Sequence, residues 1–298
     1  MMEEYNLYPL HVFRIVARLG SVTRAAQELY ISQPAVSSHL KTLEARYKET
    51  LFERTPRGML LTPAGVAVAE YANRVFALLE DITTVVEAMR GEVKGNITLA
   101  ASSTPGAYLI PRLLRRFQDR YSDASTTLLI GDSSEVLSWL REYRVALGVV
   151  GEMAVENGLI REEIARDELR LVTAATDSLC RREEITQEHL SGRTLFLRES
   201  GSSTRAGAEM LLFGYMGSFT QVVELRSTEA IKQVVIAGLG VAVLSSWATN
   251  LEEQAGLLAP VMDTRFRQER KFYAVRRADR LLVGAVAAMW ECLTSCCG

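Results

Sequence analysis

Hydrophobic residues recur every three or four positions through the first sixty residues, the spacing of helices that bury one face. The first helix is predicted to bury Leu10, Phe13, Val16 and Ala17. Gly20 is a fitting end for it, and Ser21 is a fitting cap for a short second helix. The connection Tyr30-Ile31 that follows is too short for anything but a tight turn. The pattern predicts two short helices that cross closely.

A third helix is predicted to begin at Ser32, with Pro34 in its first turn. The stripe predicted to be buried consists of Val36, Leu40, Leu43 and Tyr47. The other face carries short or flexible hydrogen-bonding side chains, namely Gln33, Ser37, Ser38, Lys41 and Thr42. Such side chains suit base edges and phosphates, although an ordinary solvated face is the alternative. Two helices joined by a tight turn, with a polar face on the second, predict a helix-turn-helix.

The segment LFERTPRGMLLT after this helix predicts a small wing. Pro56-Arg57-Gly58 forms its turn, and residues 59–61 return as a short strand. Arg54 and Arg57 are then placed near the tip of the wing, where they would reach phosphate or the minor groove. The alternative is a pair of solvated arginines in a turn. We expect residues 1–61 to form a winged helix-turn-helix domain.

Residues 62–91 predict one long helix, which begins at Thr62-Pro63 and ends at Gly91. Apolar residues follow a heptad spacing along it, at Val68, Ala72, Val75, Leu79, Ile82, Val86 and Met89. A narrow stripe sustained over so many turns favours self-association, and the alternative is packing against its own domain. A dimer would present two reading helices to a pseudo-palindromic DNA site.

From a glycine-containing hinge at residues 91–96 onward, predicted strands and helices alternate, which is typical of a doubly wound α/β domain. One round ends at VALGVVG and a second begins near TLFLRES. We expect an effector-binding domain over residues 92–298. Its lobe I covers about 97–171 and 267–298, and its lobe II covers about 172–266.

Hydroxyl-bearing residues gather where strands are expected to end and helices to begin. The four junctions are Ser102-Ser103-Thr104, Gly131-Asp132-Ser133-Ser134, Glu199 to Thr204, and Ser227-Thr228. Each could be a simple helix cap. Their recurrence at equivalent places in both lobes favours a shared cleft for a small anion or polar metabolite.

Composition narrows the class of protein. The formal net charge is -2 over 298 residues, but residues 1–61 hold eight Lys or Arg against six Glu, so nucleic-acid contact is expected to be local. The N-terminal stretch lacks the pattern of a secretory signal and no apolar run is long enough to span a membrane, so we expect a cytoplasmic protein. The cysteines Cys180, Cys292, Cys296 and Cys297 match no zinc spacing, and reduced thiols are expected.

The string from GSVTRAAQELYISQPAVSSHLKTLEARYKETLFER to LTPAG closely resembles the DNA-binding domain of LysR-type transcriptional regulators. The resemblance places the DNA-reading positions at Gln33, Pro34, Ser37, Ser38 and Lys41, with Arg54 in the wing. Many members carry Arg where this chain has Ser38, so the base preference at that position is open.

The rest of the chain is similar to the two-lobed, periplasmic-binding-protein-like effector domain of that family. The resemblance implies effector contacts at Ser102, Ser103, Thr104, Ser202, Thr204 and Thr228. It also implies homodimers that pair as tetramers on double-stranded promoter DNA, with room for contact with RNA polymerase. No catalytic residue, metal or cofactor is expected beyond the effector. The alternative is a two-lobed solute-binding protein or enzyme.

Overall fold

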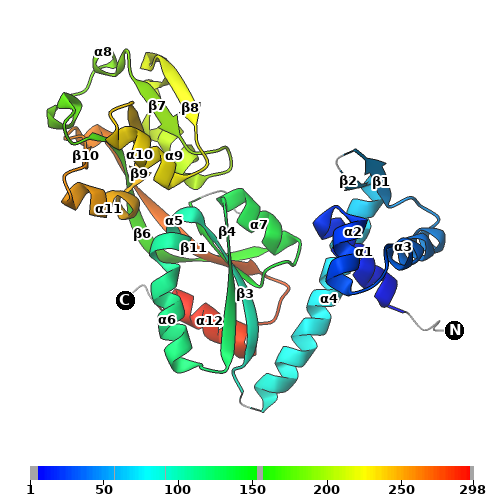
Figure 1. The fold of residues 1–298 in the computed structure, drawn as a ribbon. Helices are drawn as coiled ribbons and strands as arrows, with labels where there is room; N and C mark the ends of the chain where they lie inside the picture. The colour runs from blue at the N-terminus through cyan, green and yellow to red at the C-terminus, as the bar shows by residue number, and fades with distance from the viewer. Residues whose placement is uncertain (1–5, 57, 91, 153–156, 296–298) are drawn as a thin grey trace. The chain divides into compact units, whose positions relative to one another are not determined.

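The computed structural model describes residues 6–56, 58–90, 92–152 and 157–295. The chain divides into two compact units, Met1–Thr83 and Thr84–Gly298. Figure 1 shows the helices and strands of both units.

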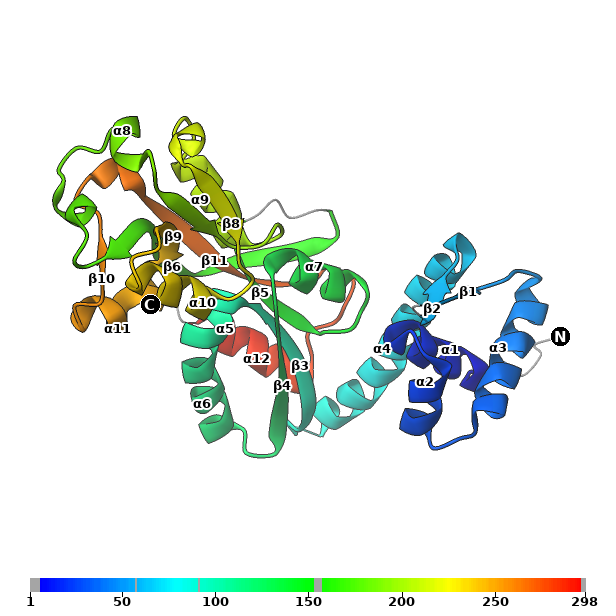
Figure 2. The ribbon, with the colours of Figure 1, turned by 45° about the horizontal axis from the view of Figure 1, so that its top comes forward.

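Three helices form the head of the first unit: α1 (Tyr8–Leu19), α2 (Val22–Leu29) and α3 (Gln33–Tyr47). The three helices pack against one another (Figure 2). Their shared core contains Phe13, Val16 and Val36, all fully buried. The predicted caps are confirmed, because Ser21 accepts a hydrogen bond from the Arg24 N–H and Ser32 accepts one from the Ala35 N–H, each at 3.3 Å. The helix-turn-helix predicted from the hydrophobic spacing is therefore present.

The wing is an antiparallel hairpin of β1 (Phe52–Thr55) and β2 (Gly58–Leu61). Gly58 has a φ of +124°, and a Cβ atom there would lie 2.4 Å from the carbonyl oxygen of Gly20. The next N–H, that of Met59, donates to the same oxygen at 2.9 Å. Glycine at position 58 lets the hairpin lie directly against the end of α1.

Helix α4 (Pro63–Met89) follows the wing at once. The Thr62 hydroxyl accepts a hydrogen bond from the Gly65 N–H at 3.0 Å and donates to the carbonyl of Thr50 at 2.7 Å. Thr62 is thus the predicted N-cap, and it also joins the first turn of α4 to the segment after α3. Gly91, the expected end of the helix, lies outside the described residues.

The expected seam along α4 needs one correction. Ala72 is 1% exposed and belongs to the core of the head domain, and Val68 packs against the same core. Both residues face their own domain because the first turns of α4 pack against the core of the head domain. These two positions cannot belong to a seam with a second copy.

The second unit contains two lobes with the same strand order. In lobe I the strands are β3 (Gly95–Ser102), β4 (Ala124–Gly131) and β5 (Leu147–Gly151), and the helices are α5 (Ser103–Tyr108), α6 (Ile110–Arg120) and α7 (Ser133–Arg141). The first strand of the lobe lies between the second and the third, and all three run parallel. Helices follow β3 and β4, as the alternating pattern predicted.

Lobe II repeats the arrangement. Its parallel strands are β7 (Thr194–Leu197), β8 (Gln221–Glu224) and β9 (Val241–Ser245), and its longer helices are α9 (Ser203–Leu211), α10 (Thr228–Ile236) and α11 (Ser246–Gln254). The short elements are η1 (Ser178–Arg181), α8 (Gln187–Leu190), η2 (Met216–Ser218), β10 (Leu258–Pro260) and η3 (Thr264–Phe266). Here too the first strand lies between the other two.

Two long strands, β6 (Leu159–Ala174) and β11 (Arg267–Arg277), pass from one lobe to the other (Figure 1). They pair antiparallel along their length, so that in the described part of the chain β3 to β11 form one nine-stranded sheet. After β11, helix α12 (Gly284–Thr294) packs into the core of lobe I, as predicted for the tail of the chain.

The expected lobe boundary near residue 171 also needs correction. On β6, Ile164 belongs to the core of lobe I, whereas Leu169 and Leu171 belong to the core of lobe II. The change of lobe therefore falls between residues 164 and 169. It lies inside a strand because β6 is continuous through both cores.

The lobes are in close contact where β5 meets the start of α9. A Cβ atom on Gly151 would lie 2.1 Å from the Ser203 Oγ and 2.8 Å from the Ser203 Cβ. Nearby, the Ser134 N–H donates to the carbonyl of Gly201 at 3.3 Å, from lobe I to lobe II. There is no room at Gly151 for any side chain while the lobes keep this distance.

We expect Gly151→Ala to lower the free energy of unfolding of the effector domain by about 1–3 kcal/mol, because the added methyl group overpacks the contact with Ser203. Thermal unfolding of the full chain followed by circular dichroism would measure the loss. Gly217→Ala is the control, since a Cβ atom there would have no neighbour within 4 Å. Equal melting temperatures for Gly151→Ala and wild type would contradict this close approach.

Candidate DNA-binding surface and effector cleft

An open groove of about 690 Å³ lies on the head domain between α2, α3 and the wing. Its lining includes four of the predicted DNA-binding residues, Gln33, Pro34, Ser37 and Arg54. The buried stripe of α3 turns away from it, since Val36, Leu40 and Leu43 are at most 6% exposed. The fold therefore brings together residues from the start of α3 and from the wing, 17 positions apart at the nearest.

Two further predicted residues, Ser38 and Lys41, are exposed on α3 but do not line the groove. Spacings of four and eight residues place Ser37 and Lys41 on the same side of the helix as Gln33. Arg57, predicted at the tip of the wing, lies outside the described residues. A polar helix face of this kind, set beside a cation on a wing, suits the edges and phosphates of duplex DNA.

The later positions of the expected seam on α4 are exposed. Leu79, Ile82 and Met89 are 41%, 60% and 83% exposed, and Val86 is exposed as well. Val75 is half-buried. Apolar side chains repeated at three- and four-residue spacing on an uncovered helix face are typical of a helix that pairs with another.

The hydroxyl-bearing junctions of the second unit meet at one place. In each lobe the first strand lies beside the second, and the junctions follow the carboxyl ends of β3 and β4 in lobe I and of β7 and β8 in lobe II. In open α/β sheets this is the position of the ligand crevice. The residues that line the resulting cleft are Ser102, Ser103, Thr104, Asp132, Ser133, Arg198, Ser202, Ser203 and Thr204.

At the floor of the cleft, Arg270 of β11 pairs with Asp167 of β6. The two residues are direct cross-strand partners, and the Arg270 Nε donates to the Asp167 Oδ2 at 2.8 Å. Arg270 also donates to the Thr204 Oγ1 at 2.9 Å and to the Thr104 Oγ1 at 3.4 Å, so it binds a hydroxyl from each lobe. Burial lowers the pKa of the Arg270 guanidinium, and the Asp167 carboxylate opposes that shift.

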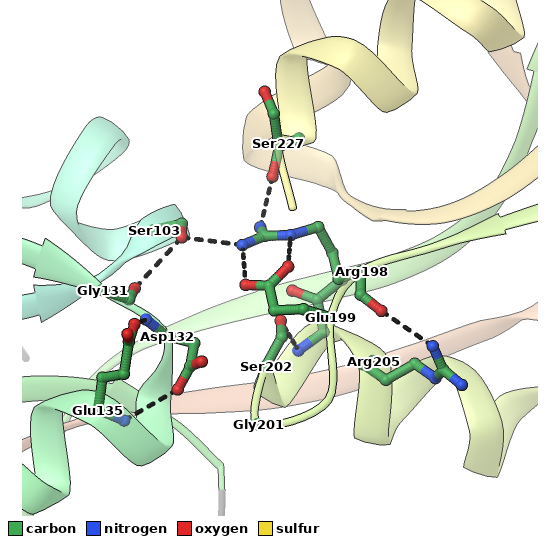
Figure 3. A network of polar contacts seen from close by, with 12 residues as sticks. Ser103, Gly131, Asp132, Glu135, Arg198, Glu199, Gly201, Ser202, Arg205 and Ser227 are labelled. Atoms are coloured by element: carbon green, nitrogen blue, oxygen red, sulfur yellow. Dashed lines mark hydrogen bonds and ion pairs between the residues drawn. The ribbon is translucent and has the colours of Figure 1, made fainter. Parts of the chain in front are cut away.

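A second buried arginine, Arg198, follows β7 and is 3% exposed. Its guanidinium forks the carboxylate of Glu199, with distances of 2.8 Å from Nε and 2.6 Å from Nη2 (Figure 3). It also donates to the Thr228 Oγ1 at 2.7 Å in lobe II and to the Ser103 Oγ at 3.1 Å in lobe I. Arg198 therefore holds the two lobes together through hydroxyl groups.

The remaining predicted effector residues lie at the same cleft. Ser202 is the N-cap of α9, accepting a hydrogen bond from the Thr204 N–H at 3.2 Å. Ser102 is buried at the end of β3. The structure thus brings together all six hydroxyl residues that the resemblance indicated, four of them within reach of a buried arginine.

Sequence reasoning missed Arg198, Arg270 and Asp167. Arg270 lies in the charged run RQERK, which reads as a solvated segment. A signal was nevertheless present, because Arg270 shares the buried side of β11 with Phe272 and Ala274 at a spacing of two. Arg198 follows the apolar strand TLFL, where a functional residue of an α/β domain is expected.

A winged helix-turn-helix, a helix with an exposed apolar seam and a two-lobed domain with a polar cleft define a ligand-responsive DNA-binding regulator. Residues 7–66 match the family described as "Bacterial regulatory helix-turn-helix protein, lysR family", and residues 90–297 match "LysR substrate binding domain". The chain belongs to the LysR family of transcriptional regulators, and it is a DNA-binding regulator rather than an enzyme.

Among its relatives is the HTH-type transcriptional activator CmpR of Synechocystis sp. PCC 6803, 31% identical over 94% of this chain and 92% of CmpR. The regulatory domain of CcmR from Synechocystis PCC 6803 in complex with 2-PG is similar in structure, with a TM-score of 0.62 and 25% identity. That similarity covers 68% of this chain and 97% of the CcmR domain. Full-length CbnR with its target DNA has the same fold, with a TM-score of 0.65 and 22% identity over 98% of this chain and 99% of CbnR.

Among the described residues, no helix is long and apolar enough to cross a membrane. No group of three or more His, Cys, Asp or Glu side chains in the same ranges is arranged to hold a metal ion. Cys180 is buried and Cys292 is half-buried, both as free thiols, while Cys296 and Cys297 lie outside the described residues.

We expect Asp167→Asn to lower the free energy of unfolding by about 3–5 kcal/mol, because it leaves the buried charge of Arg270 without its partner. Urea unfolding followed by tryptophan fluorescence would measure the change. Asp119→Asn is the matched control, since Asp119 pairs with Arg115 at 2.9 Å on an exposed helix face and such pairs contribute about 0–1 kcal/mol. A loss no larger than that of the control would contradict the role assigned to the pair.

Proposed function

We propose that this chain binds promoter DNA as a homodimer, with α3 of each copy in a major groove and the wing on the adjacent backbone. The observation that carries the proposal is the shared groove of Gln33, Pro34, Ser37 and Arg54. Gln33, Ser37, Ser38 and Lys41 would read or approach base edges, while Arg54 and Arg57 would contact phosphate. Since the DNA of a bacterium lies in its cytoplasm, we infer that the protein acts there.

The seam proposed for the dimer consists of the exposed and half-buried positions of α4: Val75, Leu79, Ile82, Val86 and Met89. Pairing along these positions would bury apolar side chains that are otherwise in water. It would also set the distance between two copies of α3, as a pseudo-palindromic site requires. We further propose that dimers pair as tetramers and that their arrangement on DNA governs contact with RNA polymerase.

The cleft of the effector domain is proposed to bind a small anionic metabolite between the lobes. Two buried arginines and six hydroxyl residues, three from each lobe, support this proposal. The regulatory domain of CcmR has been solved in complex with 2-PG, so 2-PG is the first compound to test on this chain. Binding that changes how the lobes meet would change the arrangement of protomers on the promoter.

The direct test is a gel-shift titration of the full-length protein on DNA flanking its own gene, with and without 2-PG and other small organic acids. Specific binding that competitor DNA of unrelated sequence does not remove would support the proposal. Failure to bind any promoter fragment more tightly than unrelated DNA would defeat it.

We expect Lys41→Ala and Gln33→Ala to weaken binding to the cognate site by roughly 10–100-fold, since one good base contact discriminates by about 1–3 kcal/mol. Binding to unrelated DNA should fall less for Gln33→Ala, which removes no charge. Lys48→Ala is the control, because Lys48 is an exposed lysine that caps the far end of α3. If Lys41→Ala and Gln33→Ala bind the cognate site as tightly as Lys48→Ala and wild type do, α3 is not the reading helix.

We expect Leu79→Asp to convert dimers to monomers, because it places a charge in the apolar seam. Analytical ultracentrifugation at several concentrations would measure the oligomeric state. Val66→Asp adds the same charge at an exposed position of α4 outside the seam, and it should leave the dimer intact. A Leu79→Asp variant that sediments as wild type would move the interface elsewhere.

A further inference from the structure

Arg198 holds Glu199 in the way that an arginine holds a bound organic acid. Its guanidinium meets both carboxylate oxygens of Glu199, the fork geometry that proteins use to bind organic acids and phosphates. The partner is the very next residue in the chain, and both side chains are less than 10% exposed (Figure 3). The guanidinium of Arg198 faces the cleft, and the acid group bound to it is the protein's own Glu199 carboxylate.

Two hydroxyl groups beside this pair find no hydrogen-bond partner among the described residues. They are the Ser102 Oγ and the Ser133 Oγ, on residues that are 5% and 0% exposed. Both residues line the same cleft as Arg198. A buried hydroxyl without a partner costs about 1–3 kcal/mol, so its retention indicates a group that binds it in another state of the protein.

The cleft in its present form has almost no free space. The cavity among the lining residues is about 10 Å³, which is about the least that holds one water molecule. While the lobes keep their present separation, an effector of several heavy atoms therefore needs a side chain to leave. The cleft has two buried carboxylates that pair with arginine, Asp167 and Glu199. Asp167 accepts hydrogen bonds from Arg270 at 2.8 Å and from the Ser246 hydroxyl at 2.9 Å. Within the described part of the chain, the Glu199 carboxylate is hydrogen-bonded to Arg198 alone, so releasing it breaks fewer contacts.

We infer that Glu199 occupies the place of the effector's acid group, and that the effector binds by displacing Glu199 from Arg198. This inference rests on the proposed function and specifies the ligand as a small organic acid. One carboxylate or phosphate oxygen pair forks Arg198, and further oxygens of the ligand reach Ser102 and Ser133. Exchanging one anion for another keeps the charge at Arg198 compensated, while Glu199 regains water.

The exchange has a quantitative consequence. Glu199 is tethered next to Arg198, so it competes at an effective concentration in the millimolar range or above. The measured dissociation constant of an acid equals its intrinsic constant divided by the fraction of molecules in which Arg198 is free of Glu199. Removing the Glu199 charge should therefore tighten the binding of simple anions by about tenfold or more.

The test is calorimetric titration of the full-length protein with inorganic phosphate and, separately, with acetate at constant ionic strength. Glu199→Gln keeps the size of the side chain and removes its charge, and Glu199→Ala serves as a second variant if the first does not fold by circular dichroism. We expect both to bind one anion at least about tenfold more tightly than wild type. Arg198→Gln should abolish that binding. The anion bound more tightly, phosphate or acetate, identifies the acid group.

Asp132→Asn is the matched charge control. It removes one negative charge from the same cleft without freeing Arg198, and asparagine caps helices as well as aspartate does. An affinity gain for Glu199→Gln no greater than that for Asp132→Asn would overturn the exchange, as would unchanged anion binding in Arg198→Gln.

Gel shifts with the same preparations distinguish the proposed function from the role of Glu199. If wild type does not bind DNA specifically, the proposed function is refuted. If wild type binds DNA specifically but Glu199→Gln binds anions no more tightly than wild type, only the role of Glu199 is refuted.

Discussion

The ion pair between Arg270 and Asp167 joins the two strands on which the effector domain is built. It links β11 to β6 at the level where both strands pass from one lobe to the other, and it lies between the two cores. A charge so far from water is tolerated because each of the three guanidinium nitrogens has an acceptor, on Asp167, Thr204 and Thr104. Replacing both residues by apolar ones could preserve stability, but it would remove the polar floor of the cleft.

The repeated strand order explains why the same kind of residue appears at the cleft from four parts of the chain. When the first strand of a lobe lies between the second and the third, the helices that follow leave on opposite faces of the sheet and a crevice opens between them. Asp132, Ser202 and Ser227 cap three of these helices, and Ser102 stands at the start of the fourth without a cap hydrogen bond. The caps of two lobes facing one another then form a surface rich in hydroxyl groups.

The local signals in the sequence were sufficient for the head domain. Ser21, Ser32 and Thr62 cap the helices that the spacing predicted, because capping depends on neighbours within three residues. The seam of α4 was harder, because heptad spacing does not say whether the facing surface belongs to the same chain. Val68 and Ala72 turned out to face their own domain.

The crossing strands were the part that pattern reading could not supply. Four of the first eight residues of β6 are charged, at 161–163 and 166, so this half reads as a solvated segment. The strand is buried through its pairing with β11, a hundred residues further on, and with β9 and β10. The six hydroxyl residues were found because they sit at strand ends. The arginines that bind four of them were not, because a charged residue on a buried strand face becomes recognisable only when its partner is known.

The double role of Thr62 has a mechanical consequence. Its hydroxyl caps α4 and is bonded to Thr50, and its N–H donates to the carbonyl of Leu51 at 3.1 Å, so the start of α4 is fastened to the chain that leaves α3. A hinge at this junction would have to break two hydrogen bonds in a buried place. α3 and the first turns of α4 therefore rotate together as one rigid body, and a twist of α4 would turn α3 with it.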